Sequence, residues 1–195
     1  MVLLTCLLVQ GAENYWPLDV GREWAYASTS KAGALTLRWA VTGTRKVKGA
    51  EGVVFSMEVP DASSKPALKR TEVFVLRLEK EGVKFLDWDG AGPGDLGYLL
   101  KIPLKKGLKW ENRLLAGPEM EVSEGAEDVK VPAGTFTCRK ITFVNGYPGG
   151  RKVSTTWWLA DGTGLVKSEE LSEGGGAEPS KKVVELKELK KPEGK

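Results

Sequence analysis

Apolar and polar residues alternate along most of this chain, and no other sequence feature constrains its fold as strongly. Residues 35–42 place Leu, Leu, Trp and Val at every second position, and residues 53–59 repeat the pattern after a turn at 48–52. A period of two is typical of a strand with one buried and one solvated face. No window of a dozen residues shows the period of 3.6 that an amphipathic helix needs. The sequence therefore predicts an all-β fold.

The turns indicate how the strands are joined. Glycine closes the loops at 79–82 and 161–164, where a positive φ suits a hairpin. The Gly-rich stretch at 172–180 is expected to be a flexible loop within the domain, because strand-like residues follow it. We expect a strongly curved antiparallel sheet of about ten or eleven strands, closed or half-closed into a barrel, with a two-sheet sandwich as the alternative. Further strands are expected at residues 71–78, 83–88, 135–144, 152–160, 165–171 and 183–189.

Three landmarks occur twice in the same order. Pro17-Leu18-x-x-Gly21-x-x-Trp24 recurs as Pro103-Leu104-x-x-Gly107-x-x-Trp110, and Val-Lys-x-x-x-Gly occurs at 47–52 and 129–134. Each of those pairs is followed by a hairpin glycine, at Gly82 and Gly164. Ordered recurrence indicates two similar β-meanders over about 15–90 and 101–171, with the C-terminal strand as an addition. The alternative is that these residue types commonly occur where a strand begins, without any duplication of the chain.

In both cases the repeated motif predicts a structural role and no chemistry. Proline suits the irregular segment before a strand, glycine allows a tight turn, and tryptophan starts the strand facing inward. The motif residues are Pro17, Leu18, Gly21, Trp24, Pro103, Leu104, Gly107 and Trp110.

Residues 1–12 are similar to a short export signal. Residues 2–9 form an apolar run too short to span a bilayer, and Gln10-Gly11-Ala12 offers small residues for cleavage, although no basic residue precedes Arg22. We expect an exported protein of the periplasm or cell envelope whose mature chain begins near residue 12 or 13. A lipid anchor at Cys6 and a buried N-terminal strand are the alternatives. The rest of the chain is predicted to be a single all-β domain at 13–190 with a polar tail at 191–195.

Composition excludes several kinds of chemistry. The chain has no histidine, which excludes Ser-His-Asp and Cys-His catalysis and His-ligated zinc. Two cysteines cannot form a four-thiolate site. The net charge of +3 comes from residues 181–195, which hold six Lys and three Glu, so the rest of the chain is neutral and unsuited to nucleic acid. We expect no cofactor, no metal site and no catalytic residue.

The opening Tyr15-Trp16-Pro17-Leu18, with Gly21, Trp24 and Tyr26, resembles the TapB-like families of exported bacterial β-proteins and related domains of unknown function. The segments 131–138, VPAGTFTC, and 158–167, which ends in Gly-Leu-Val-Lys, resemble other parts of that group. The resemblance implies a large curved antiparallel sheet in a secreted or lipid-anchored protein. It implies no activity and no catalytic residue.

The tryptophans are the most distinctive candidates for a binding site. Such rings stack on sugars or line apolar cavities, but more often they pair across strands and fill a core. Trp157 and Trp158 are adjacent, so they are expected to point to opposite faces of one strand. The seven are Trp16, Trp24, Trp39, Trp88, Trp110, Trp157 and Trp158.

Two further candidates favour ordinary structural roles. Asp87-Trp88-Asp89-Gly90, with Asp95 nearby, is similar to a calcium loop, but Ala91 and Tyr98 stand where an EF-hand needs oxygen ligands. A loop is the better interpretation. Cys138 lies at an alternating strand position, which is typical of a small buried hydrophobe.

These features favour a non-enzymatic cell-envelope module that binds an apolar ligand or a partner protein. The alternative is a purely structural or assembly protein without a small ligand, and a hydrolase that uses carboxylates is third. The first two differ in whether the sheet encloses an apolar cavity or is filled by its own side chains. The membrane is a partner only for a lipid-anchored form.

Overall fold

A computed structural model describes residues 13–61, 68–89, 96–112 and 119–192, and in them twelve strands form one antiparallel sheet. A 3-10 turn, η1 (Pro148–Gly150), interrupts the succession of strands. The strands are β1 (Glu23–Ser30), β2 (Gly33–Val47), β3 (Ala50–Asp61), β4 (Leu68–Glu79), β5 (Gly82–Trp88), β6 (Tyr98–Lys101), β7 (Lys109–Glu111), β8 (Glu119–Val131), β9 (Gly134–Gly146), β10 (Lys152–Ala160), β11 (Gly164–Glu173) and β12 (Ser180–Lys190).

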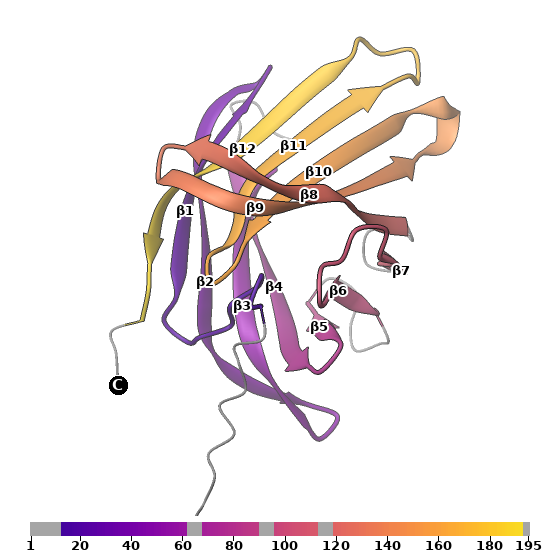
Figure 1. Cartoon of the computed structure of the whole chain (residues 1–195). Coiled ribbons are helices and arrows are strands. Elements are labelled where there is room, and N and C mark those ends of the chain that lie inside the picture. The colour runs from indigo at the N-terminus through magenta and orange to yellow at the C-terminus, as the bar shows by residue number, and fades with distance from the viewer. Residues whose placement is uncertain (1–12, 62–67, 90–95, 113–118, 193–195) are drawn as a thin grey trace, which may run out of the picture.

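The sheet curves round into a nearly closed barrel (Figure 1). Strands β1 to β6 pair in chain order, as do β7 to β12, and β1 pairs with β12. The two edge strands, β6 and β7, face each other across a seam that is bridged between Gly97 and Asn112. This near-closure leaves β6 and β7 as the edge strands of the described sheet and places them side by side, which limits the pairing of either edge with other chains. The predicted all-β barrel is confirmed.

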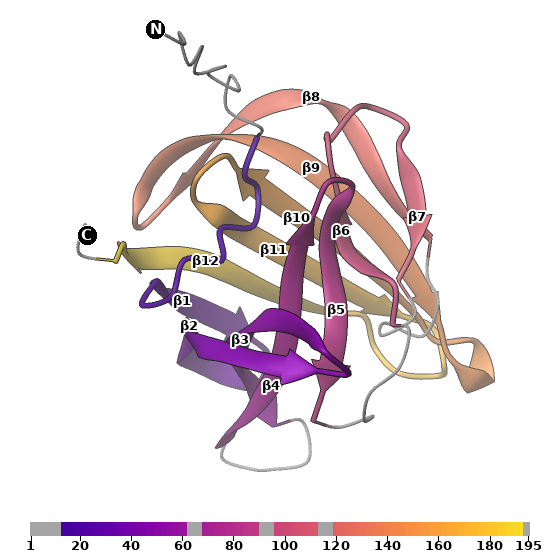
Figure 2. The same cartoon turned by 90° about the horizontal axis from the view of Figure 1, so that it is seen from below.

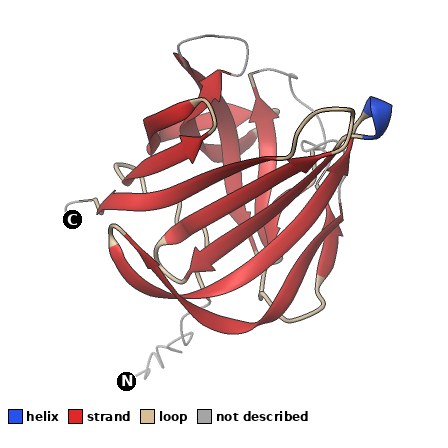
Figure 3. Ribbon diagram, turned by 90° about the horizontal axis from the view of Figure 1, so that it is seen from above, coloured by secondary structure: helices blue, strands red, loops and turns tan. Residues whose placement is uncertain are grey.

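The barrel has two ends that differ in what covers them. Residues 13–22 cross one end, which we call the closed end, and it faces the viewer in Figure 2. This N-terminal segment is fixed there because Gly162 N donates to Asn14 O at 2.9 Å and Gly21 N donates to Val41 O at 2.8 Å. The opposite end, which we call the mouth, carries η1 and the β11–β12 loop (Figure 3).

Alternation directs a dense group of aromatic rings into the barrel. The Trp16 ring on the N-terminal segment lies 6.2 Å from Trp39, 5.9 Å from Phe55 and 6.1 Å from Trp157, measured between ring centroids. The neighbouring Trp158 faces outward instead, where its Nε1 donates to Glu127 Oε1 at 2.5 Å. The expected opposite orientation of these two rings is therefore observed.

The long β8–β9 hairpin curves along one side of the barrel, and its turn reaches β12 (Figure 2). Ala133 N in its turn donates to Leu186 O at 3.0 Å. The hairpin buries Val131 and Cys138 completely or nearly so. Burial raises the pKa of the Cys138 thiol to about 12, and the nearby Glu127 and Asp128 charges add to the shift. This thiol is therefore protonated at neutral pH.

The two copies of the repeated motif make the same backbone hydrogen bonds. Gly21 and Gly107 both have positive φ, of 91° and 78°. Gly21 N donates to Val41 O at 2.8 Å, and Gly107 N donates to Val122 O at 2.9 Å. Each valine N–H donates back to the residue after the glycine. Trp24 begins β1 and Trp110 lies in β7, and both are buried. The motif thus ties each strand entry to the following long strand.

The partners of the two indoles differ, and this predicts unequal mutational costs. Trp24 Nε1 donates to the buried Thr163 O at 2.7 Å, whereas Trp110 Nε1 has no hydrogen-bond partner among the described residues. Trp24→Phe should therefore destabilise the protein by about 1–2 kcal/mol more than Trp110→Phe, because it strands a buried carbonyl. Urea unfolding of both variants measures the difference. Equal losses would show that the Trp24 hydrogen bond contributes nothing.

Candidate functional site

An apolar cavity of about 320 Å³ lies inside the barrel. Phe74 and Leu76 on β4 and Phe85 on β5 are buried in its wall. Rings dominate the lining because alternation on each strand sends its large apolar residues inward. We call this space the inner chamber. Its lining residues are Trp16, Trp39, Phe55, Met57, Arg70, Glu72, Phe74, Leu76, Phe85, Trp88, Leu99 and Trp157.

A second space of about 380 Å³ continues from the inner chamber towards the mouth. Trp39, Met57, Arg70, Glu72 and Trp157 line both spaces, which makes them parts of one lumen. We call this second space the outer chamber. Its wall is more polar and draws residues from β2, β3, β4, β9, β10, β11 and β12. The polar residues among its lining are Glu58, Arg70, Glu72, Asn145, Tyr147, Arg151, Thr155, Ser168, Glu170 and Lys182.

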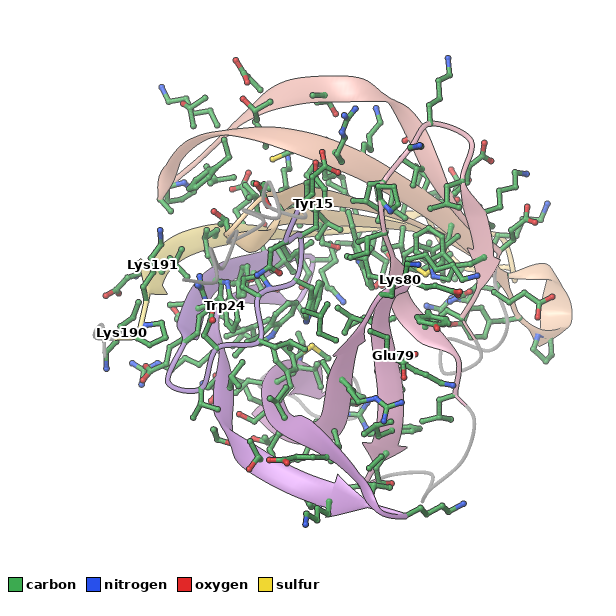
Figure 4. All side chains as sticks on the ribbon, turned by 60° about the horizontal axis from the view of Figure 1, so that its bottom comes forward. Tyr15, Trp24, Glu79, Lys80, Lys190 and Lys191 are labelled. Carbon is green, nitrogen blue, oxygen red and sulfur yellow. The ribbon has the colours of Figure 1, made fainter. Side chains whose placement is uncertain are left out.

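The N-terminal segment provides the floor of the lumen. Trp16 is 94% buried, since 6% of its surface is exposed, and it lines the inner chamber. Tyr15 beside it is equally buried, and Figure 4 shows Tyr15 and Trp24 at the closed end. Asn14 N donates to Asp161 Oδ1 in the β10–β11 turn. The lumen is thus apolar at the closed end and polar at the mouth.

Most charges at the mouth are already paired. Arg70 Nη2 lies 2.7 Å from Glu72 Oε1, and Lys182 Nζ lies 3.1 Å from Glu170 Oε2. Glu58 pairs with Lys69 at 3.0 Å. Each of these three mouth carboxylates therefore lies within 3.1 Å of a Lys or Arg nitrogen.

The two described aspartates of the segment similar to a calcium loop form ion pairs with an arginine. Asp87 and Asp89 contact the Arg45 guanidinium, at 2.9 Å and 3.1 Å. Asp95 and Cys6 lie outside the described residues, as does the export-like segment. Within the described ranges, no three His, Cys, Asp or Glu side chains gather as a metal site would require. Those ranges also hold no helix long and apolar enough to cross a membrane.

Comparison with known proteins identifies related folds. The model of the DUF3108-like family matches residues 120–181. A chain from Bacteroides fragilis NCTC 9343, described as a candidate exported protein with YmcC-like fold, aligns over 93% of this chain and 100% of its own, with a TM-score of 0.54 and 18% identity. The shared feature is the fold.

A candidate lipoprotein from Parabacteroides distasonis ATCC 8503 aligns over the same 93% and 100%, with a TM-score of 0.49 and 15% identity. No curated protein matches the chain. The resemblance to TapB-like proteins stays a prediction.

The shifted pKa values predict a flat stability profile between about pH 5 and 8. Hydrogen bonds from Arg77 and from Lys167 hold the pKa values of Glu79 and Glu169 below 4.5, so their stabilisation is present above that value and is lost as pH falls. Burial raises the pKa of Cys138 to about 12, so stability falls as pH rises above about 9, where the unfolded thiol ionises. Urea midpoints measured from pH 4 to 11 test this profile. A slope exceeding about 1 kcal/mol between pH 5 and 8 would reveal a perturbed acid.

Proposed function

We propose that the protein is a non-enzymatic, extracytoplasmic binding module whose lumen holds a small apolar ligand. The observation that carries the proposal is the apolar cavity of about 320 Å³ inside the barrel. A cavity of roughly 150 Å³ already binds benzene, and ligand pockets start at about 300 Å³. A protein with a purely structural role gains stability by filling such a space, since voids lower stability.

The location outside the cytoplasm is supported by the apolar run at residues 2–9 and the small residues that follow it. The description of the similar Bacteroides fragilis chain as a candidate exported protein agrees with it. The absence of histidine from the whole sequence and the paired state of Glu58, Glu72 and Glu170 favour binding over hydrolysis.

Binding of a fluorescent apolar probe tests the proposal. N-phenylnaphthylamine is uncharged and brightens in apolar surroundings, and we expect it to bind the native protein in a saturable way. Met57 lines both chambers, so Met57→Trp fills the passage between them. This variant should weaken probe binding by about tenfold or more, which is about 1.4 kcal/mol.

Leu78→Trp is the matched control, because Leu78 is 55% exposed and lines neither chamber. It adds the same side chain outside the lumen and should leave the probe affinity unchanged. A native protein that fails to bind the probe, or equal binding by folded Met57→Trp and Leu78→Trp, would reject a lumenal ligand site. A near-native circular dichroism spectrum for Met57→Trp ensures that the comparison is between folded proteins.

A further inference from the structure

From the distribution of charge along the lumen, we infer that the ligand is a long-chain amphiphile with one anionic headgroup, and that Arg151 at the mouth binds that headgroup. The inference rests on the proposed lumenal site and specifies what occupies it. Its parts are an apolar tail channel, a polar mouth and one positioned cation.

The polarity of the lumen changes along its axis. On β4 the inward positions run from Arg70 and Glu72 near the mouth to Phe74 and Leu76 deep inside. On β10 the wall runs from Val153 and Thr155 near the mouth to Trp157 in the inner chamber. A ligand that is apolar throughout would leave the polar wall of the outer chamber unmatched. A molecule with an apolar tail and a polar head matches both parts.

The length of the lumen suits an acyl chain. Arg151 lines the outer chamber, and Trp157, six residues further along the chain, lines both chambers. Six extended residues span about 20 Å at roughly 3.3 Å each. This is the reach of a long single alkyl chain lying parallel to the strands, with its end against the aromatic floor.

Of the cations that line the outer chamber, Arg70, Arg151 and Lys182, Arg151 is the one without a carboxylate partner among the described residues. Its Nε donates to Ser172 Oγ at 2.8 Å, and its guanidinium lies 5.4 Å from the centre of the Tyr147 ring. Lys69, Arg70 and Lys182 each lie within 3.1 Å of a carboxylate oxygen. The charge available at the mouth is therefore positive and lies at Arg151, where its terminal nitrogens match the two oxygens of a carboxylate or phosphate.

The surrounding loops hold Arg151 in place. Tyr147 N donates to Arg151 O at 2.8 Å, which closes the loop that contains η1. Gly174 and Gly175 of the β11–β12 loop pack against it so closely that added Cβ atoms would lie 2.5 Å from Gly150 O and 3.1 Å from Arg151 Cβ. These contacts fix the backbone of Arg151, while the Ser172 hydrogen bond and the Tyr147 ring orient its exposed guanidinium. A cation oriented beforehand loses less freedom when it binds an anion, which favours affinity.

Four probes with the same alkyl chain separate head from tail: laurate, dodecyl phosphate, dodecanol and dodecylamine. Each is titrated below its micelle concentration against protein loaded with N-phenylnaphthylamine. Laurate should displace the probe at about one tenth of the concentration that dodecanol needs, and dodecylamine should be weakest. Dodecyl phosphate distinguishes a phosphate head from a carboxylate head by whichever of the two anions binds more tightly.

Variants assign the preference to Arg151. Arg151→Gln should reduce laurate affinity to that of dodecanol and leave dodecanol binding unchanged, whereas Arg151→Lys should keep most of the preference. Arg38→Gln is the matched control, because Arg38 is exposed on β2 and lines neither chamber. It removes the same charge and should change neither affinity.

Different experimental results would reject the anionic headgroup and the lumenal site. Equal binding of laurate and dodecanol by the native protein, or a laurate preference that survives Arg151→Gln, would overturn the anionic headgroup while the lumenal site stands. Failure of the native protein to bind N-phenylnaphthylamine or any of the four probes would overturn the site itself.

Discussion

Gly82→Ala should disrupt the start of β5 and its pairing with β6, with a loss of more than about 3 kcal/mol in the free energy of unfolding. Gly82 has a φ of 145°, and an added Cβ would lie 2.0 Å from Leu100 O and 2.8 Å from Lys101 Cα. Both atoms belong to the backbone of β6, so no side-chain rotation relieves the overlap. Because β6 is an edge of the sheet, we expect the damage to open the seam.

Gly33→Ala is the matched control for that substitution. Gly33 also has a positive φ, of 118°, but nothing lies within 4 Å of its added Cβ. It should lose only the conformational term, about 1 kcal/mol. Urea unfolding compares the two variants, and exchange of the β5–β6 amides locates the damage. Equal losses would mean that β6 moves aside without cost.

Trp16→Ala should destabilise the protein by about 3–5 kcal/mol, the usual cost of removing a large buried aromatic side chain. Its ring lies within 6.2 Å of Trp39, Phe55 and Trp157, and it closes the lumen floor. The substitution leaves an apolar hole next to the inner chamber. Added indole should bind that hole and restore part of the lost stability, as small aromatics do in engineered cavities.

Trp158→Ala controls for the removal of an indole. Trp158 is partly exposed, and Lys167 Nζ lies 5.4 Å from the centre of its ring on the outer surface. It should lose about 1 kcal/mol and gain nothing from indole. Stability of Trp16→Ala that matches this control would show that the N-terminal segment is not part of the folded barrel.

The period-two pattern predicted the all-β fold because each strand keeps one dry and one wet face. Three strands lacked that signal. In β8, a register shift between Val122 and Ala126 interrupts the alternation, and β6 and β7 are too short to show it. The β11–β12 loop was expected to be flexible, yet Gly174 and Gly175 pack against Gly150 and Arg151. That contact joins segments distant in sequence, so local composition could not predict it.

The lumen could be predicted only in part from the sequence. The tryptophans were recognised as candidates, but core filling and cavity lining use the same rings. Arg70 and Glu72 carried a usable signal, since they precede Phe74 and Leu76 at inward positions of one strand. Charged residues on an otherwise apolar face indicate where a lumen becomes polar. The similarity of the two whole halves, residues 15–90 and 101–171, stays a prediction. Superposition of one half on the other tests it.

The pairing of β1 with β12 has a consequence for the order of folding. These are the first and last strands, and their ladder runs from Glu23 opposite Lys190 to Thr29 opposite Val183. Strand β1 therefore lacks this neighbour until β12, more than 150 residues later in the chain, has emerged from the ribosome. A chain stalled before β12 carries an open edge, the surface on which β-proteins aggregate and which chaperones shield. Contacts this distant in sequence also make slow folding the expectation.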